Sequence, residues 1–507
     1  MKHYSILLFA IFFGLLSSCN PNKEEGDQNI DVTFIQLNDV YEIAPLAGGK
    51  LGGMGRVETI HQELKAENPN TFMFLAGDFL NPSLYSALTF EGEKIKGRQM
   101  VEVMNAMNFD LVTFGNHEFD LKEKELQSRL NESNFAWTSA NVYHQIDSVK
   151  GPFYKEVNGK KSIIPKSYIL EGKDSDGTTV KIGMISVTLP VNAPDYVAYD
   201  DVYEAARLAY EKVSKETDFV IGLTHLAVEQ DQKLGEYIPE LKLIMGGHEH
   251  ANMLVPVGNL NIAKADANAI SIYIHKLHYN KRNKKLEIKS TLKKIDDSIA
   301  SNAEVDKIVS KWQVILNNLV KTVVAKPDEV IYTAKEPLEA REKPLRSSQT
   351  NLGKIVANAM LQATNADCAI VNSGSIRIDD QLSGAITAVD IFRTLPYGGA
   401  IFTIDVKGDF LKEILEFGES KSGKGAYLQR AHVNKNEADQ KWYIGKGEAI
   451  DDEKVYKVAI TDFLMTGYDI PFLNYDNKKV LKVSEPKPTS DAFDIRKSVI
   501  NYLKQLD

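Results

Sequence analysis

The chain has 507 residues, of which 43% are hydrophobic and 25% are charged, and its formal net charge is −9. This length predicts at least two domains, because a typical domain has roughly 100–200 residues. The two cysteines exclude a disulfide scaffold and any zinc module built on paired cysteines, and the acidic balance argues against a nucleic-acid polymer as partner. A small anionic substrate stays possible where arginine or metal ions reverse the local charge.

The N-terminus has the layout of a secretory signal. A basic start precedes an apolar run over residues 6–16, which is too short to span a bilayer because about 20 apolar residues are needed. The sequence LSSC at residues 16–19 resembles the lipobox of bacterial lipoproteins. It predicts a signal peptide over residues 1–19 and a lipid on Cys19 that anchors the protein in the cell envelope, in the periplasm or at the cell surface. An ordinary cleaved signal is the alternative. The polar residues 20–30 are predicted to form a flexible tether.

From residue 31 onward, short apolar runs alternate with helical patterns. The runs predicted as strands are 32–37, 71–75, 111–114, 219–223 and 241–245, and helical patterns cover, for example, 57–67 and 203–215. This alternation predicts an α/β domain whose strands are buried on both faces. In such sheets, ligands bind beyond the strand ends.

Polar residues with metal-ligating side chains follow these runs. They are Asp39, Asp78, Asn116 and His117, His225, and His248 with His250. Carboxylate, amide and imidazole donors together suit borderline divalent metals such as Mn, Fe, Co or Zn. Two such ions about 3.5–4 Å apart, bridged by one carboxylate, can clamp a phosphoryl group and turn a bound water into hydroxide near neutral pH.

Three sequence blocks resemble those of calcineurin-like metallophosphoesterases. They are Gly77-Asp78, GNHEFD at residues 115–120 and GGHEH at residues 246–250. With the C-terminal half, the chain resembles the bacterial 5′-nucleotidase/UDP-sugar hydrolase family from residue 31 to the C-terminus. The resemblance implies a four-layer α/β/β/α metallophosphoesterase sandwich over residues 31–300 that binds two divalent ions.

The resemblance also implies a role for each motif residue. Asp78 would bridge the two metal ions. Asp39 and His250 would bind one ion, and the ligands of the other would be Asn116, His225 and His248. His117 and Asp120 would form the catalytic dyad, in which Asp120 orients the imidazole.

Two positions admit other interpretations. At Tyr41 the family usually has histidine, and a phenol with a pKa near 10 is a poor ligand for a divalent metal. Tyr41 could hydrogen-bond a metal-bound water, ligate a more acidic ion such as ferric iron, or mark a weakened first site that still supports catalysis, which is the interpretation we favour. Asp120 and Glu123 also match a capping box, so Asp120 could be the N-cap of the following helix.

The second half of the chain is predicted to bind the substrate. Apolar residues at helical spacing predict a linking helix over residues 301–326, before an α/β 5′-nucleotidase C-terminal domain over residues 327–507. The resemblance implies a hinge in that helix and possible rotation of the domains. The sequence NSGSIR, with Asn372, Gly374 and Arg377, looks like the family's Asn-x-Gly-x-Ile-Arg motif. The forked guanidinium of Arg377 suits phosphate, carboxylate or ribose, although a structural salt bridge is the alternative.

In this family the nucleobase stacks between two aromatic rings. Tyr397, in the sequence LPYGG, matches the position of one ring. For the second ring the resemblance points to Phe472, which follows Asp469 in the stretch GYDIPF. Compared with the family's stretch, two glycines are missing and the aromatic residue is displaced by one position.

These features predict a lipid-anchored metallophosphoesterase that hydrolyses nucleoside 5′-monophosphates to nucleoside and phosphate. Within the same enzyme class, a 2′,3′-cyclic-nucleotide phosphodiesterase and a UDP-sugar diphosphatase are the alternatives. A surface binding lipoprotein that has lost one metal is the alternative from another class. Tyr41 favours it, and the intact His117 and Asp120 oppose it. The sequence leaves the metal, the nucleotide and the oligomeric state open.

Overall fold

The computed structural model describes residues 28–47, 49–191, 193–321, 324–327, 329–378 and 380–506. The predicted signal peptide, Cys19 and most of the predicted tether lie outside these residues. The last two residues of that tether, Asn29 and Ile30, belong to the first strand and are paired with Asn280 and Tyr279. No helix within the described ranges is long and apolar enough to cross a membrane.

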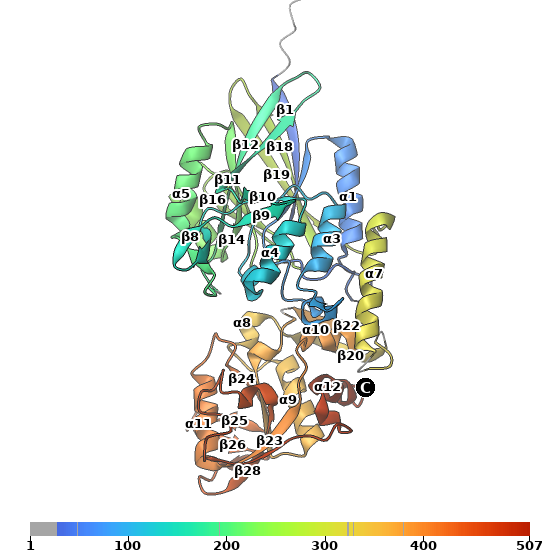
Figure 1. The fold of residues 1–507 in the computed structure, drawn as a ribbon, viewed down its shortest axis with the longest axis vertical. Coiled ribbons are helices and arrows are strands. Elements are labelled where there is room, and N and C mark those ends of the chain that lie inside the picture. The colour runs from blue at the N-terminus through green and yellow to red at the C-terminus, as the bar shows by residue number, and fades with distance from the viewer. Residues whose placement is uncertain are drawn as a thin grey trace, which may run out of the picture.

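Two six-stranded sheets form the centre of the N-terminal domain (Figure 1). In order, the first sheet contains β19 (Lys285–Lys294), β18 (Ser271–Asn280), β1 (Asn29–Leu37), β2 (Thr71–Leu75), β5 (Leu111–Val112) and β6 (Ala136–Trp137). The second contains β11 (Ser167–Lys173), β12 (Thr179–Thr188), β14 (Phe219–His225), β15 (Leu243–Gly246), β17 (Leu260–Lys264) and β16 (Met253–Val257).

Strand β1 shows how the two sheets pack. Because side chains alternate along a strand, Val32 and Phe34 point into the core between the sheets, where they join Met245 of β15. Ile35 and Leu37 point to the opposite face and pack in the core beneath the outer helices. Both faces of β1 are therefore buried, as its near-continuous apolar sequence predicts.

Helices cover the outer face of each sheet. The first sheet is covered by α1 (Met54–Glu67), α3 (Arg98–Ala106) and α4 (Glu123–Glu132), and the second by α5 (Val202–Val213) and α6 (Val228–Tyr237). The result is the four-layer α/β/β/α sandwich that the resemblance implied. Shorter elements complete this domain: α2 (Leu84–Ala87), β3 (Thr89–Phe90), β4 (Glu93–Lys94), the 3-10 helix η1 (His117–Asp120), β7 (Val142–Ile146), β8 (Val149–Gly151), β9 (Tyr154–Val157), β10 (Lys160–Ile163) and β13 (Val197–Tyr199).

The linking helix is α7 (Ala303–Val320), which ends before the predicted residue 326. It runs along the N-terminal domain toward the C-terminal domain (Figure 1). Its Trp312 is fully buried and donates a hydrogen bond to Glu102 of α3 (3.0 Å), and Lys311 pairs with the same carboxylate (2.8 Å). The helix is thus attached to the N-terminal domain along its apolar side.

The C-terminal domain is built on a five-stranded sheet. In order, its strands are β24 (Leu428–Ala431), β21 (Cys368–Asn372), β28 (Val455–Thr461), β23 (Ile401–Lys407) and β29 (Val480–Ser484). The smaller sheets are formed by β20 (Val330–Glu339) with β22 (Gln381–Thr387), and by β25 (Val433–Lys435), β26 (Trp442–Ile444) and β27 (Glu448–Ala449). The helices are α8 (Glu342–Leu345), α9 (Asn351–Thr364), η2 (Ser373–Ser375), α10 (Ala388–Thr394), α11 (Gly408–Glu419), η3 (Asp462–Met465), η4 (Asp491–Phe493) and α12 (Ile495–Leu503).

Candidate active site

The predicted ligands lie at one edge of the two central sheets. Strands β1, β2 and β5 run parallel in the first sheet, and β12, β14, β15 and β17 run parallel in the second. Parallel strands bring their carboxyl ends to the same edge. Asp39 and Asp78 follow β1 and β2, His225 ends β14, and His248 and His250 follow β15. The sheet topology therefore gathers side chains that lie up to 211 residues apart in the chain.

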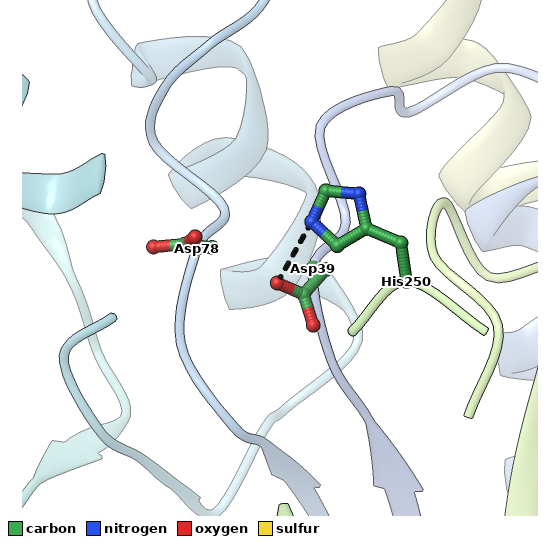
Figure 2. A group of neighbouring side chains, drawn as sticks. All are labelled: Asp39, Asp78 and His250. Carbon is green, nitrogen blue, oxygen red and sulfur yellow. Dashed lines mark ion pairs between the residues drawn. The ribbon is translucent and has the colours of Figure 1, made fainter. Parts of the chain in front are cut away.

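Asp39, Asp78 and His250 form the first group (Figure 2). One ligand atom of each lies within 4.8 Å of the others, and Asp39 Oδ1 is 3.3 Å from His250 Nε2. Asp39 Oδ2 accepts a hydrogen bond from the backbone N–H of His248 (2.8 Å), whereas Oδ1 is buried and accepts none from the described residues. Two buried carboxylates this close together repel each other unless a cation lies between them, so the arrangement suits a metal ion. The donor set thus fits a divalent ion.

His225, Asn116 and Asp78 form the second group. His225 Nδ1 donates to the carbonyl of Ala76 (2.8 Å), which leaves Nε2 as the nitrogen available to a metal. That Nε2 lies 3.2 Å from Asn116 Oδ1 and 3.2 Å from Asp78 Oδ2. The ring of His248 is next to His225, with 5.4 Å between the ring centroids. Asp78 therefore belongs to both groups, as a bridging ligand must.

The backbone holds these ligands in an unusual conformation. Asp39, Asp78, His248 and His250 have φ angles of 54°, 56°, 91° and 60°. A non-glycine residue in this region costs on the order of 1–3 kcal/mol and persists where the surrounding structure imposes it. Gly115 allows the approach, because a Cβ atom there would lie 2.1 Å from Asp78 Oδ1. The fold therefore positions the ligands before any metal binds.

Glu118 is a structural residue of the site that the sequence did not reveal as such. Its buried carboxylate accepts backbone hydrogen bonds from Asp78 (2.9 Å), Phe79 (2.8 Å), Leu80 (3.1 Å) and Gly115 (2.6 Å). Burial and the neighbouring Asp78 carboxylate raise the pKa of Glu118 to about 7. Glu118 fixes the loop that carries the bridging carboxylate. The sequence feature that could have identified Glu118 was its position inside the GNHEFD block.

His117 and Asp120 form the predicted dyad. His117 Nδ1 lies 2.7 Å from Asp120 Oδ2, and the same oxygen accepts from Asn81 Nδ2 (2.9 Å). Burial lowers the pKa of His117, but the carboxylates of Asp120 and Asp78 outweigh burial and raise that pKa to about 9. The imidazole is therefore protonated at neutral pH in the protein without metal.

The interpretation of Asp120 as a helix N-cap is wrong. Asp120 is the last residue of η1, and the backbone is extended at Leu121 and Lys122 before α4 begins. The N-cap is Lys122, whose backbone N–H donates to Glu125 at 2.9 Å. The two extended residues separate Asp120 from the helix, so its carboxylate serves His117.

Tyr41 lies in the first group. Its side chain is buried, and its hydroxyl is 3.0 Å from His250 Nε2 and 3.3 Å from Asp78 Oδ2. The phenol therefore occupies a position from which it can contact an ion or a water held by these residues. This contact is compatible with all three interpretations of Tyr41, namely a hydrogen bond to a metal-bound water, ligation of a more acidic ion, and a weakened first site.

Three predicted substrate residues of the C-terminal domain, Asn372, Gly374 and Asp469, lie near one another. Asn372 Nδ2 donates to Asp469 Oδ2 (2.7 Å), and the backbone of Gly374 donates to Gly425 (2.8 Å). Arg377 reaches the N-terminal domain, where its Nη2 is 3.2 Å from Asp120 Oδ2. The salt bridge considered for Arg377 thus exists, and its partner is a residue of the dyad.

The two predicted aromatic residues differ in exposure. Tyr397 is 64% exposed, as a stacking ring must be. Phe472 instead is half-buried and packs edge-on against Phe410 and Phe417, with centroid distances of 5.8 and 5.3 Å. Its ring thus lies against the margin of the C-terminal core. Tyr468, which the sequence reasoning missed, is 82% exposed in the same loop and stands where the family has a glycine.

Known proteins share both halves of the chain. The family model described as calcineurin-like phosphoesterase matches residues 32–252, and the model described as 5′-nucleotidase, C-terminal domain matches residues 330–474. The chain is 26% identical to the trifunctional nucleotide phosphoesterase protein YfkN of Bacillus subtilis, with 89% of this chain covered but only 33% of that longer protein. It is 25% identical to the 5′-nucleotidase of Vibrio cholerae, with 92% and 90% of the two chains covered.

A solved structure agrees with the fold. The 5′-nucleotidase precursor from Thermus thermophilus superposes with a TM-score of 0.67 at 21% identity, covering 94% of this chain and 97% of that one. Both domain models, the matching relatives and the site geometry lead to one conclusion. The chain belongs to the 5′-nucleotidase family of metallophosphoesterases, which are hydrolases.

Proposed function

We propose that this protein hydrolyses nucleoside 5′-monophosphates to nucleoside and phosphate at a centre of two divalent metal ions. The observation that supports this most directly is the position of Arg377. It comes from the 5′-nucleotidase C-terminal domain and lies within 3.2 Å of Asp120, beside the ligand groups of the phosphoesterase domain. A substrate bound by the C-terminal domain can therefore present its phosphate to the metal centre.

The ligands would be divided as their positions suggest. Asp39 and His250 would hold one ion, and Asn116, His225 and His248 the other, with Asp78 between them. Ions bound there would polarise the phosphoryl oxygens and make a water nucleophilic near neutral pH. Mn, Zn, Fe and Co all suit these donors.

The protein's own contribution is the His117–Asp120 pair. Because Nδ1 is engaged by Asp120, His117 has Nε2 left to face a phosphoryl oxygen, and a protonated imidazole would donate to that oxygen as negative charge builds up on it. Asp120 holds the imidazole orientation and is itself held by Asn81 and Arg377. The presence of this dyad favours a catalytic function over the alternative of a surface binding protein.

The exposed tyrosines of the C-terminal domain would receive the base. Tyr397 and Tyr468 are the two strongly exposed rings in the loops that the sequence associates with the nucleobase. Stacking on an aromatic ring contributes about 1–3 kcal/mol per base in other proteins and tolerates different bases.

A substrate panel tests this function. The protein would be stripped with a chelator, reloaded with Mn, Co, Zn or Fe, and assayed with 5′-AMP, 2′,3′-cyclic AMP, UDP-glucose and an aryl phosphate diester. We expect 5′-AMP to be preferred and Asp78→Ala to lower the rate at least about 100-fold. Preference for the cyclic nucleotide or the UDP-sugar would replace the proposed substrate, and no turnover with any metal would contradict the enzyme assignment.

We also propose that Cys19 carries a lipid that holds the protein in the cell envelope. The support is the LSSC sequence that follows a short apolar run. Metabolic labelling with a radioactive fatty acid should mark the wild-type chain and leave Cys19→Ala unlabelled. Equal labelling of both chains would exclude Cys19 as the site.

A further inference from the structure

Lys264, at the end of β17, carries a buried positive charge directly beneath the histidine loops. Its side chain is fully buried. Its Nζ donates to the backbone carbonyls of Leu226 (2.6 Å) and Gly247 (2.7 Å) and to the carboxylate of Glu249. Leu226 directly follows His225, and Gly247 and Glu249 flank His248.

Two carboxylates complete this cluster. Asp231 Oδ2 lies 2.9 Å from Lys264 Nζ, and Asp231 Oδ1 accepts a hydrogen bond from Thr224 Oγ1 (2.7 Å). Glu249 Oε1 accepts from the backbone N–H of Val228 (2.5 Å). Each carboxylate therefore joins Lys264 to the segment around His225. The Lys264 ammonium therefore contacts the residues that follow β14 and β15 and, through Asp231, helix α6.

The residues that follow Lys264 support the other ligand loops. The backbone N–H of Ala267 donates to the carbonyl of His250 (3.1 Å), and that of Asn268 donates to the carbonyl of Asp39 (2.9 Å). Asn268 Oδ1 also accepts from the backbone of Tyr41 (3.0 Å). The segment 264–268 thus contacts the loops of four predicted metal ligands without supplying a ligand itself.

We propose that Lys264 is a positioning residue of the metal centre, which fixes the spacing of His225, His248 and His250 before metal binds. This inference rests on the metal centre proposed above. The physical reason is that the histidine loops come from separate strands and four of the ligand residues adopt strained backbone angles. Loops held in such geometry need compensating contacts. Replacing the ammonium with an apolar group would leave the buried carboxylate of Asp231, the half-buried carboxylate of Glu249 and two backbone carbonyls without their shared partner.

The test measures metal affinity without substrate. Zinc and manganese would be titrated into the metal-free full chain against a chromophoric chelator, for wild type, Lys264→Met and Glu249→Gln. We expect Lys264→Met to weaken binding about 10–100-fold, the usual effect of losing a residue that orients a ligand. Glu249→Gln should weaken binding less, because Lys264 keeps its bonds to Leu226 and Gly247. Excess metal should restore activity to both variants.

Arg129→Met is the matched control for a purely structural loss. Arg129 is also a buried cation of the N-terminal domain, bonded to the carbonyl of Ile95 (2.5 Å) and paired with Glu132 (2.6 Å), away from the ligand loops. The Arg129→Met variant should have a lower melting temperature without metal and an unchanged metal affinity. If Lys264→Met does not fold, the affinity of Glu249→Gln decides.

Two outcomes would overturn the inference. The first is a folded Lys264→Met, or a Glu249→Gln when that variant decides, that binds metal within twofold of wild type. The second is an equal loss of affinity in Arg129→Met, which would reduce Lys264 to a general stabilising residue. A wild-type chain that binds metal but hydrolyses no nucleotide would overturn only the proposed function, because affinity is measured without substrate.

Discussion

Arg377 and Asp120 come from different domains, yet Arg377 Nη2 lies 3.2 Å from Asp120 Oδ2. The same carboxylate oxygen accepts from His117 Nδ1 at 2.7 Å. One oxygen thus links the arginine of the substrate domain to the imidazole of the dyad. In this arrangement, the position of the C-terminal domain influences the charge around His117, so binding and catalysis share a residue.

Replacing Arg377 should therefore affect both kinetic constants. In Arg377→Ala we expect KM for 5′-AMP to rise more than KM for an aryl phosphate, because the sequence predicts that the motif containing this arginine binds the nucleotide. We expect kcat to fall about 10- to 100-fold for both substrates, because a charge-assisted hydrogen bond such as that to Asp120 contributes about 1.5–3 kcal/mol. Steady-state kinetics measure both, and Lys504→Ala, which removes an exposed ion pair with Glu329, should change neither. An unchanged kcat on the aryl ester would contradict the link to Asp120.

The dyad variants should separate catalysis from metal binding. His117→Gln and Asp120→Asn should lower kcat about 100-fold, the effect of losing a group that stabilises transition-state charge. Metal content should stay at the wild-type level, because neither residue is among the proposed ligands. Turnover assays combined with elemental analysis of the same samples check this. A loss of metal in His117→Gln would mean that the imidazole is a ligand instead.

Tyr41→His is the sharpest test of the first metal group. The phenol oxygen is 3.0 Å from His250 Nε2, so an imidazole there would offer a better donor to the same ion. We expect a higher metal occupancy and an unchanged preference among nucleotide substrates. Tyr41→Phe, which removes only the hydroxyl, is the control and should not raise occupancy. If occupancy stays constant in Tyr41→His, Tyr41 does not stand in a ligand position.

His275 should make the fold sensitive to acid. It is fully buried between Ser290 Oγ (2.8 Å) and Gln36 Oε1 (2.9 Å), and burial lowers its pKa to about 3. An unfolded histidine has a pKa near 6.5, so between these values unfolding takes up a proton. The free energy of unfolding should therefore fall by about 1.4 kcal/mol per pH unit as the pH decreases from 6.5 toward 3.

Denaturant unfolding of metal-free protein at several pH values measures this slope. His275→Gln should lose it and be less stable at neutral pH, where wild type keeps its two hydrogen bonds. His278→Gln is the matched control, since this histidine is exposed on the same strand, β18, and pairs with Asp31. An unchanged slope in His275→Gln would show that the buried imidazole does not control acid stability.

The tyrosine rings should determine nucleotide affinity. Tyr397→Ala and Tyr468→Ala should each raise KM for 5′-AMP by about tenfold, within the range expected for one stacked ring. KM for an aryl phosphate should change little, because it carries no base. Phe472→Ala should reduce thermal stability through lost contacts with Phe410 and Phe417 and leave KM for 5′-AMP unchanged. A large KM effect of Phe472→Ala alone would restore it as the second ring.

The sequence determined the parallel central strands and the polar residues that follow them. Buried parallel strands have near-continuous apolar runs, so β1, β2 and β14 could be recognised and the polar residues after them assigned to one edge. His275 and His278 lie three residues apart on β18 and therefore point to opposite faces, and one is buried whereas the other is exposed. These features follow from local periodicity, which each segment carries by itself.

Only the tertiary structure decided how the ligand loops are held and how the domains meet. Glu118 and Lys264 bind backbone groups of segments distant in sequence, and no local pattern distinguishes such residues from ordinary charged ones. Phe472 and Tyr468 lie four residues apart, yet the first is half-buried against Phe417 and the second is exposed to solvent. The contact between Arg377 and Asp120 joins residues 257 positions apart. Such contacts depend on the packing of whole elements, because they form only after the sheets and the linking helix have set where the loops lie.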